Sequence, residues 1–534
     1  MPLGAFKATI FGAAGGGSAL GYILLYGDPD NAGGVNAETY PYNIQKLSNG
    51  TTVRIGGRFG TSASESSRMA SGEIDLSGGY GTAPTSLNNQ LAWSWRAGST
   101  YNTITNAAGA MWVDGSDNLY DCGKSYNASY GYNNSMFTKF NSSQVNQWNQ
   151  SWNTVNTYPY GVQDPQIIKT DGSNPKVVGF MKTSNYRAGA YKGRCQVQPM
   201  SDSDGGGIAG QKLVYPNNDS SYSSQINGSC VVSKQTYNDY FATAMPYYNS
   251  YSYQLPAIML WQAESGNVQN QYGYNVAALR NQSTGASGNG DCYASGITID
   301  SSYNTYLLCH GNSSKHSGMS GSGYLENVII AKYNSSGTLQ WAYALRQQTG
   351  GANSGQGSNM YPGGIVCDNG DDLYISGYSM GEDGNQNNSP FIARIDVSGA
   401  TPSLTWINQA CSSSYACYAQ NVERIGTDQV VAFGYGQTDP SSNVVGVMPS
   451  MNIDGSTVGT ADVDGITWNV LDLSSKIIFQ DATTSTENVN FTNWTGGVLV
   501  SSSSTEASDS QGTISAFTSG APSVTLTVES GDVA

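Results

Sequence analysis

Residues 365–377 read Ile-Val-Cys-Asp-Asn-Gly-Asp-Asp-Leu-Tyr-Ile-Ser-Gly, and this stretch decides the fold. An apolar pair leads into an Asp/Asn/Gly turn, and an alternating strand follows and ends in glycine. The same order appears at residues 111–123, Met-Trp-Val-Asp-Gly-Ser-Asp-Asn-Leu-Tyr-Asp-Cys-Gly. Weaker copies lie at residues 43–57, 166–179, 296–311 and 421–434. Because turn residues between alternating strands are typical of tight hairpins, the copies predict a repeat protein built from β-hairpins.

A second stretch alternates with the first and consists of a strand, a short turn and a strand that ends near tryptophan. Residues 328–341 are its best copy, and further copies end at Trp148 and Trp406. The glycines that close the first stretch are Gly57, Gly123, Gly179, Gly311, Gly377 and Gly434, at intervals of 66, 56, 132, 66 and 57 residues. Because the long interval equals two periods, we expect a poorly marked fourth unit near residues 226–261.

Seven units of this kind predict an all-β fold, a seven-bladed β-propeller. Each unit supplies two antiparallel hairpins, or about four strands, which is the content of one blade. Stacking the blades around an axis buries their apolar faces and leaves only short strand edges. We expect a short N-terminal anchoring or capping segment at 1–36, the propeller at 37–470 and a small C-terminal β-rich unit at 471–534. A ring of six or eight blades is the alternative, because the blade boundaries within 215–290 are poorly marked.

The composition agrees with an all-β, turn-rich protein. The 534 residues include 66 glycines, which argues against helical bundles and Rossmann enzymes. A net charge of −15 disfavours binding to nucleic acid. Only 11% of the residues are charged, but 38% are hydrophobic, so the chain can bury a core. We expect no membrane span, because the most apolar run, residues 8–25, is diluted by glycine; a signal peptide there is an alternative.

Two resemblances follow from these patterns. The pairing of Asp-x-x-Gly-x-x-Tyr-x-x-Gly with Phe-Ile-Ala-Lys-Tyr-Asn-x-x-Gly-x-Leu-x-Trp resembles the bacterial β-propeller repeats known as SBBP repeats, most closely at 326–345 and 363–395. The whole chain is similar to virion fibre and tail proteins of marine phages in its start, Met-Pro-Leu-Gly-Ala-Phe-Lys, in its Asn, Ser, Tyr and Gly content and in its β-rich tail. The second resemblance implies a protein at the virion surface.

The cysteines are too sparse for a disulfide framework, with eight in the whole chain. Four of them lie in or beside apolar strand-like runs and are expected to be buried thiols, namely Cys122, Cys230, Cys309 and Cys367. Cys411 and Cys417 bracket a five-residue loop, and we expect a disulfide between them. Only His310 and His316 could join a metal site, and no Cys-x-x-Cys occurs, so we expect no metal centre and no cofactor.

The sequence shows no catalytic constellation. A Ser-His-Asp triad would need His310 or His316 as its base, and neither lies beside a nucleophile motif, so we expect both to be structural. The acidic clusters at 202–204 and 368–372 lack the spacing of an EF-hand and are expected to be solvated turns. A glycan-degrading propeller would need an axial pocket lined by two or more carboxylates, whereas an axis lined by Ser, Gly and Asn would exclude it.

Tyrosine-rich loops are the predicted contact surfaces. Tyrosine offers amphipathic contact area that can stack on sugars or pack in a protein interface. The candidate ligand or partner contacts are Tyr237, Tyr240, Tyr247, Tyr248, Tyr251, Tyr253, Tyr126, Tyr130 and Tyr132. The alternative is that these rings only hold long loops against the propeller.

These observations lead us to expect a non-enzymatic structural or adhesion protein of a phage virion, such as a tail fibre or a surface component of the tail or capsid. Its loops would contact host-surface glycans or neighbouring virion subunits. The sequence leaves the oligomeric state open, and a homo-oligomer is one alternative. One alternative is a glycan-degrading propeller enzyme similar to a tailspike. Another is a secreted bacterial propeller from a cell surface or an extracellular assembly.

Overall fold

The computed structural model describes twenty-three segments of the chain. They are residues 21–27, 39–59, 68–95, 101–104, 111–127, 132–154, 163–187, 190–208, 212–216, 231–248, 254–264, 267–277, 292–313, 325–347, 359–368, 370–382, 387–437, 444–463, 465–482, 492–501, 509–513, 517–518 and 527–533. In these segments the regular elements are strands, and no helix of membrane-spanning length and hydrophobicity occurs.

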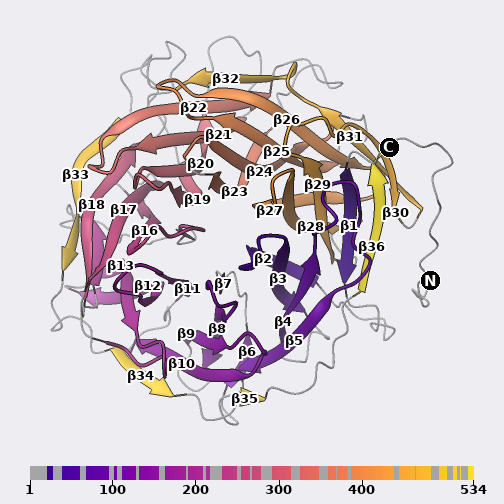
Figure 1. Cartoon of the computed structure of the whole chain (residues 1–534). Coiled ribbons are helices and arrows are strands. Elements are labelled where there is room, and N and C mark those ends of the chain that lie inside the picture. Colours follow the sequence, from indigo (N-terminus) through magenta and orange to yellow (C-terminus); the bar gives the residue numbers. More distant parts are fainter. Residues whose placement is uncertain are drawn as a thin grey trace.

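The strands form seven antiparallel blades around a central axis, which confirms the predicted propeller (Figure 1). Blade 1 contains β2 (Thr39–Lys46), β3 (Thr52–Phe59), β4 (Arg68–Asp75) and β5 (Asn88–Trp95). Blade 2 contains β7 (Trp112–Val113), β8 (Leu119–Asn127), β9 (Tyr132–Phe140) and β10 (Asn146–Thr154), and β6 (Tyr101–Ile104) also pairs with β8. Blade 3 contains β11 (Gln163–Lys169), β12 (Val177–Arg187), β13 (Ala190–Met200) and β14 (Lys212–Pro216).

The remaining blades follow the same order from the axis outward. Blade 4, the poorly marked unit, contains β15 (Val231–Val232), β16 (Tyr240–Tyr248), β17 (Gln254–Glu264) and β18 (Asn267–Ala277). Blade 5 contains β19 (Cys292–Ile299), β20 (Thr305–Ser313), β21 (Leu325–Tyr333) and β22 (Leu339–Gln347). Blade 6 contains β23 (Met360–Asp368), β24 (Asp372–Met380), β25 (Asn388–Asp396) and β26 (Ser403–Ser412). Blade 7 contains β27 (Ala416–Ile425), β28 (Gln429–Gln437), β29 (Val444–Asn452) and β1 (Gly21–Gly27).

The hairpin turns adopt the backbone that their sequences predict. Gly337 and Gly370 close turns between paired strands and have φ angles of 76° and 88°. This left-handed region is readily accessible to glycine and strained for residues with a Cβ atom. In blade 5 the carboxylate of Asp300 accepts hydrogen bonds from the backbone N–H groups of Ser302 and Asn304, at 2.8 and 2.9 Å. An aspartate at this position accepts hydrogen bonds from the backbone N–H groups of the turn, and this role explains the Asp-rich signature of the repeat.

The N-terminal strand closes the ring. β1 pairs with β29 along its length, so residues 21–27 lie inside the propeller, although we expected 1–36 to anchor or cap it. Side chains alternate along a strand, so Tyr22 and Leu24 pack with blade 1 residues, whereas Ile23 and Leu25 pack with blade 6 residues. One strand therefore seals both neighbouring interfaces of blade 7.

The C-terminal strands form a belt around the outside of the ring (Figure 1). For residues 471–534 we expected a small C-terminal β-rich unit. The belt adds an outer strand to every blade and visits them in the order 6, 5, 4, 3, 2, 1 and 7. Its strands are β30 (Gly459–Val463), β31 (Ile466–Asp472), β32 (Ile477–Asp481), β33 (Thr492–Ser501), β34 (Asp509–Thr513), β35 (Phe517–Thr518) and β36 (Thr527–Val533). β33 pairs with both β18 and β14 and joins blades 4 and 3 into one nine-stranded sheet. The belt satisfies backbone groups that an open blade edge would leave unpaired.

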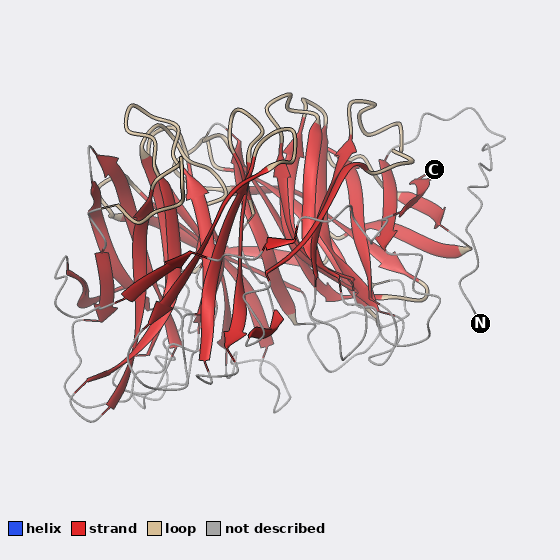
Figure 2. Ribbon diagram, turned by 90° about the horizontal axis from the view of Figure 1, so that it is seen from below, coloured by secondary structure: helices blue, strands red, loops and turns tan. Residues whose placement is uncertain are grey.

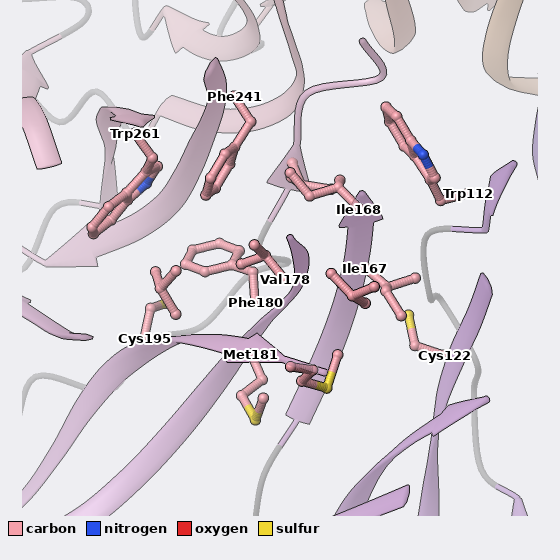
Figure 3. Packing of buried hydrophobic residues seen from close by; sticks show 14 of the residues in the cluster. Trp112, Cys122, Ile167, Ile168, Val178, Phe180, Met181, Cys195, Phe241 and Trp261 are labelled. Atoms are coloured by element: carbon pink, nitrogen blue, oxygen red, sulfur yellow. The ribbon is translucent and has the colours of Figure 1, made fainter. Parts of the chain in front are cut away.

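The apolar core lies between neighbouring blades rather than on the axis. In the cluster that joins blades 2, 3 and 4, Phe180 and Ile167 of blade 3 lie between Phe241 and Trp261 of blade 4 and Cys122 of blade 2 (Figure 3). All five side chains are at most 1% exposed. Face-to-face burial of this kind fixes the angle between blades and so positions the residues around the axis.

Buried polar residues lie on the neighbouring faces of blades 1 and 2. Arg54, which is 2% exposed, pairs with Glu73 and donates to the hydroxyl of Ser71. Asp121 alternates along β8 with Tyr120 and Cys122, which pack toward blade 3, so its side chain points the other way. Its Oδ1 accepts a hydrogen bond from the Cys122 N–H, while its Oδ2 is buried without a hydrogen-bond partner. Burial raises the pKa of Asp121 to about 8.

Replacing Asp121 with asparagine should remove a pH dependence of stability. The folded chain keeps the Asp121 proton up to a pKa of about 8, whereas the unfolded chain releases it near 3.8. The contribution of the protonated Asp121 to the free energy of unfolding is therefore fully present below about pH 4. It falls as the pH rises toward 8, by up to about 1.4 kcal/mol per pH unit. We expect Asp121→Asn to match the wild type at pH 4 and to exceed it by several kcal/mol at pH 8 in urea unfolding. Asp396→Asn, at an exposed turn, is the control and should leave the slope between pH 5 and 8 unchanged.

Candidate functional site

The central channel has two mouths that differ in how the strands are connected. At the tight-turn mouth the first strand of each blade turns into the second and the third into the fourth, as at residues 300–304. Figure 2 shows described loops gathered along one edge of the ring. At the connection mouth the second strand leads to the third, and the fourth to the next blade. Most of these connections, such as 314–324 and 348–358, lie outside the described residues. Loops that carry binding residues can extend from either mouth.

A pocket of about 510 Å³ lies at the tight-turn mouth. Residues from blades 1, 2, 3, 4 and 7 line it, including the aromatic rings of Trp112 and Tyr237. Its lining also contains three carboxylates and three lysines, namely Asp114, Asp171, Glu423, Lys46, Lys169 and Lys234. The axis is therefore not lined by Ser, Gly and Asn alone, so the condition that would have excluded a glycan-degrading enzyme is not met.

Two side chains from blade 4 cross the channel and form a plug beneath this pocket, which we call the axial plug (Lys234 and Gln235). The Lys234 Nζ donates to the carbonyl of Ile44 in blade 1 at 3.2 Å and to that of Val422 in blade 7 at 3.1 Å. It also lies 3.6 Å from the carboxylate of Glu423. Burial lowers the pKa of Lys234 to about 8, although Glu423 opposes this shift. The ammonium is thus held by three groups across the axis.

Gln235 ties the plug to the opposite side of the ring. Its Nε2 donates to the carbonyl of Cys367 in blade 6 at 2.8 Å. Its Oε1 accepts from the hydroxyl of Thr298 in blade 5 at 3.0 Å and from the N–H of Cys367 at 3.3 Å. Through two consecutive residues, blade 4 is therefore hydrogen-bonded to blades 1, 5, 6 and 7. β15 ends at Val232 because the chain leaves the sheet there and enters the channel.

The charged groups at the wall of the pocket are also paired with one another. Lys169 donates to Asp114 at 2.8 Å, to Asp202 at 3.0 Å and to the hydroxyl of Tyr120 at 3.1 Å. Burial tends to raise the pKa of Asp114, but hydrogen bonds from Asn118 and Lys169 outweigh it and lower the pKa. Carboxylates held in this way stay ionised and are poor proton donors. These charged groups at the tight-turn mouth therefore form ion pairs and hydrogen bonds with one another.

Six half-buried rings line the connection mouth and form a continuous row, which we call the aromatic arc. They are Tyr293, His310, Tyr361, Tyr378, Tyr418 and Tyr435. In blades 5, 6 and 7 respectively, the two rings of one blade face each other across the first two strands. Each pair is stacked, with centroids 4.8, 4.9 and 5.0 Å apart. The pairs meet through edge contacts between blades, at 5.9 Å for His310 with Tyr361 and 4.9 Å for Tyr378 with Tyr418.

A local irregularity in the innermost strands accompanies the arc. The pairing register shifts between Ala294 and Gly296 in β19, between Pro362 and Ile365 in β23 and between Ala419 and Asn421 in β27. In all three strands the shift follows directly after the tyrosine of the arc. Bulges re-aim side chains and are common beside binding sites. The repeat thus places one ring pair at equivalent strand positions in each of blades 5, 6 and 7.

His310 is the exception within the arc, because blades 6 and 7 carry Tyr378 and Tyr435 at the equivalent position. Burial lowers the pKa of His310 to about 4, so the imidazole is neutral at physiological pH. Its Nδ1 is buried without a hydrogen-bond partner. A neutral imidazole can accept a proton, and the lowered pKa makes this one a weak base.

The structure separates the tyrosines that we singled out in the sequence. Tyr237 lines the axial pocket, and Tyr240 stacks on Tyr303 at a centroid distance of 4.1 Å near the same mouth. Burial raises the pKa of Tyr237 to about 12. The backbones of Tyr126, Tyr132, Tyr247 and Tyr248 lie at strand ends near the connection mouth. Tyr130, Tyr251 and Tyr253 lie outside the described residues. The expected single cluster at 237–253 is thus divided between the two mouths by the length of β16.

Sequence reasoning missed the aromatic arc. Its members are scattered singly over residues 293–435, and none belongs to a tyrosine-rich loop. The available signal was the repeat itself, because Tyr378 and Tyr435 directly follow the closing glycines Gly377 and Gly434. Aligning all copies by strand position would have placed aromatic residues in register across three blades.

Cys411 and Cys417 are buried thiols and not the disulfide that we expected. Cys411 donates to the Oε1 of Gln409 at 3.4 Å, and Cys417 donates to the carbonyl of Tyr415 at 3.7 Å. Burial raises the pKa of Cys417. A thiol in this state reacts slowly, because the thiolate is the reactive form. Among the described residues, no group of three or more His, Cys, Asp and Glu side chains is placed to hold a metal ion.

Comparisons with known proteins bear on the fold alone. No protein-family description and no curated protein sequence matches the chain. A solved structure from Dyadobacter fermentans, a protein of unknown function, is 8% identical over 81% of this chain and 98% of its own, with a TM-score of 0.35. The polysaccharide lyase Uly1 is 9% identical over 79% and 91%, with a TM-score of 0.40. An α-L-arabinofuranosidase of Fusarium graminearum, solved with arabinobiose, is 10% identical over 67% and 96%, with a TM-score of 0.30.

These names correct one expectation drawn from the sequence. We expected a non-enzymatic protein, and the enzyme names of similar propellers contradict that expectation. At this level of similarity they assign no activity to this chain, so its function has to be argued from its own residues.

Proposed function

We propose that the protein is a carbohydrate-active propeller that binds a polysaccharide across the aromatic arc and degrades it. The arc is the observation that carries this proposal, because six half-buried rings lie in one row at a channel mouth. Aromatic rings pack against the apolar faces of sugars, while tyrosine hydroxyls can bond the sugar hydroxyls. Because the row extends over three blades, it suits a polymer better than a small molecule.

The acid–base groups near the axis support degradation in addition to binding. Cleavage of a glycosidic bond requires proton transfer, which needs a positioned group that can change its protonation state. His310 can supply only the accepting half of such a transfer, because burial lowers its pKa to about 4 and leaves the imidazole neutral; the proton on the leaving oxygen would come from water. The carboxylates of Asp114 and Glu423 are less suited, because lysines neutralise both of them at the opposite mouth.

Removing the central ring pair should abolish tight glycan binding. Tyr361→Ala combined with Tyr378→Ala deletes the stacked pair of blade 6, and aromatic contacts are each worth about 0.5–1.5 kcal/mol. We therefore expect affinity for a bound polysaccharide to fall about 5- to 150-fold in affinity gel electrophoresis or calorimetry. The matched control is Tyr240→Ala with Tyr303→Ala, a stacked pair near the tight-turn mouth. Equal losses in both double variants would contradict a site at the arc.

Degradation is tested on the same polymer with His310→Tyr, which installs the residue found at this position in blades 6 and 7. The ring pair is kept, so binding should stay within about twofold, whereas loss of the proton acceptor should slow chain shortening by about 10²–10⁴-fold. Size-exclusion chromatography follows polymer length, and a reducing-end assay counts the new ends. A wild-type protein that binds the polymer but never shortens it would contradict the degrading part of the proposal.

Location and partners stay predictions from the sequence. We propose a protein that acts outside the cell, on a virion or on a cell surface, where polysaccharides are met. Electron microscopy of particles labelled with an antibody to this chain would show gold on virions if the phage resemblance is meaningful. Unlabelled particles, with the protein found in the culture medium, would favour the secreted alternative.

A further inference from the structure

Four of the six charged side chains that line the axial pocket pair with one another, and two do not. The Nζ of Lys46, which is half-buried, donates to the carbonyl of Arg424 at 3.1 Å. Asp171, which is exposed, accepts a hydrogen bond from the hydroxyl of Thr236 at 3.3 Å. Within the segments that the structure describes, neither Lys46 nor Asp171 forms an ion pair. The pocket therefore presents one ammonium and one carboxylate that a ligand of opposite charge could meet.

Two uncharged side chains near Lys46 also lack partners. Gln45 precedes Lys46 on β2, Trp112 lies on the neighbouring blade 2, and each is 7% exposed. Both line the pocket, and neither side chain forms a hydrogen bond with a described residue. Buried polar groups in folded proteins are almost always hydrogen-bonded. An amide and an indole N–H left without partners at a cavity wall therefore indicate a partner that occupies the cavity.

The unpartnered groups are ordered around the pocket by blade. Lys46 and Gln45 belong to blade 1, Trp112 belongs to blade 2, and Asp171 lies in the loop after β11 in blade 3. Three hydrogen-bond donors thus lie on one side, namely the ammonium, the amide and the indole N–H, and a carboxylate lies on the other. A zwitterion laid from blade 1 to blade 3 would meet donors with its own carboxylate and an acceptor with its own ammonium.

The size and position of the pocket favour a short ligand with separated charges. Packed sheets lie about 10 Å apart, and blade 2 separates Lys46 from Asp171. Such a span suits charges that are joined through peptide bonds better than the two charges of one amino acid. The volume of about 510 Å³ is typical of ligand pockets, which measure about 300–1,000 Å³. The axial plug lies beneath the pocket, which favours a short ligand over a chain that passes through the channel.

We propose that the axial pocket binds a short peptide with free termini, whose carboxylate is held by Lys46 and whose ammonium is held by Asp171. Gln45 would bond the carboxylate or the adjacent peptide group, because its amide both donates and accepts. Charge-assisted hydrogen bonds at both termini supply most of the affinity. This site lies at the mouth opposite to the aromatic arc, and its failure would leave the proposed function standing.

The first test needs no variant and uses tri-alanine, its N-acetylated form, its C-terminal amide and free alanine. In titration calorimetry at 20 mM NaCl we expect tri-alanine to bind. Each blocked form should bind about 10- to 100-fold more weakly, because it lacks one charge-assisted contact. Free alanine should also bind more weakly than tri-alanine, because it cannot reach both charges. Absence of tri-alanine binding, or equal affinity for the free and blocked peptides, would overturn the proposal. Free alanine that binds as tightly as tri-alanine would overturn the span from blade 1 to blade 3.

Two variants then assign each terminus to its residue through double-mutant cycles. Lys46→Gln should weaken the binding of tri-alanine about 10- to 100-fold but change the affinity for its amide less than about twofold, because amidation has already removed that contact. Asp171→Asn should behave in the same way toward the N-acetylated peptide. Each variant is compared with itself on two peptides, so a loss of folded protein affects both alike.

The matched control is Lys176→Gln, which removes the same charge near the same mouth but from a residue outside the pocket lining. It should leave the affinities for all the peptides within about twofold of the wild type. If Lys46→Gln weakens the free and the amidated peptide equally, the carboxylate is not held by Lys46 and the proposed orientation is wrong. A loss in Lys176→Gln as large as in Lys46→Gln would show an effect of net charge alone and overturn the site.

Discussion

A chain that lacks residues 21–27 is expected to lose most of its stability, the largest effect predicted here. Deleting β1 leaves blade 7 with three strands and opens both interfaces that the strand seals. Tyr22, Ile23 and Leu24 are fully buried, and Leu25 is 7% exposed. Burial of four such side chains contributes ~6–12 kcal/mol, which is comparable to the total stability of a typical domain. We expect no cooperative thermal transition, or one lowered by tens of degrees.

Rescue by a peptide separates ring closure from general damage. A synthetic peptide covering residues 20–28 should pair with β29 by strand addition and restore a cooperative transition at high peptide concentration. A peptide with Ile23→Asp and Leu24→Asp is the control and should not rescue, because it would bury two charges. A truncated chain that melts like the intact protein would show that β1 does not close the ring.

Lys234→Ala should be the most damaging single substitution among the charged residues. It removes the ammonium that binds two carbonyls from different blades, and it leaves Glu423 buried, at 6% exposure, without its cation. Breaking one partner of a buried ion pair costs about 3–5 kcal/mol. Urea unfolding at pH 7 measures the loss.

The matched double variant shows whether the cost comes from the orphaned carboxylate. Lys234→Met with Glu423→Gln removes both charges and keeps the side-chain volume, so we expect most of the lost stability to return. Lys476→Ala is the control, because its side chain is 46% exposed and its ammonium pairs with a single carboxylate, that of Glu382. Water can replace an exposed ammonium, so we expect a smaller loss than for Lys234→Ala. A loss for Lys234→Ala as small as the control's would mean that the axial plug does not hold the blades together.

The repeat made the propeller predictable, because every copy carries its own turn signal. Gly337 and Gly370 adopt the positive φ angles that their turns required, and the blade number followed from the spacing of closing glycines. The two ends of the chain were not predictable in this way. β1 and the belt carry strand-like sequences but no repeat, and a strand pattern does not say which edge it will join. Their partners are set by the open edges of the blades.

The candidate site was less accessible to sequence reasoning than the fold. The sequence pattern predicts Gly311 as the closing glycine of its unit, yet strand pairing makes Cys309 the residue equivalent to Gly377. This offset of two residues hid the equivalence of His310 with Tyr378. The axial plug was equally invisible, because Lys234 and Gln235 occupy a break in a short strand and acquire partners only when the ring closes.

The most direct measurement for the central claim is a crystal structure of the full chain soaked with an oligosaccharide of the best-bound polymer. The account predicts sugar rings along blades 5, 6 and 7, in contact with Tyr293, Tyr361 and Tyr418 or their paired rings. Sugar bound only in the pocket above the axial plug, or along the outer belt, would contradict it.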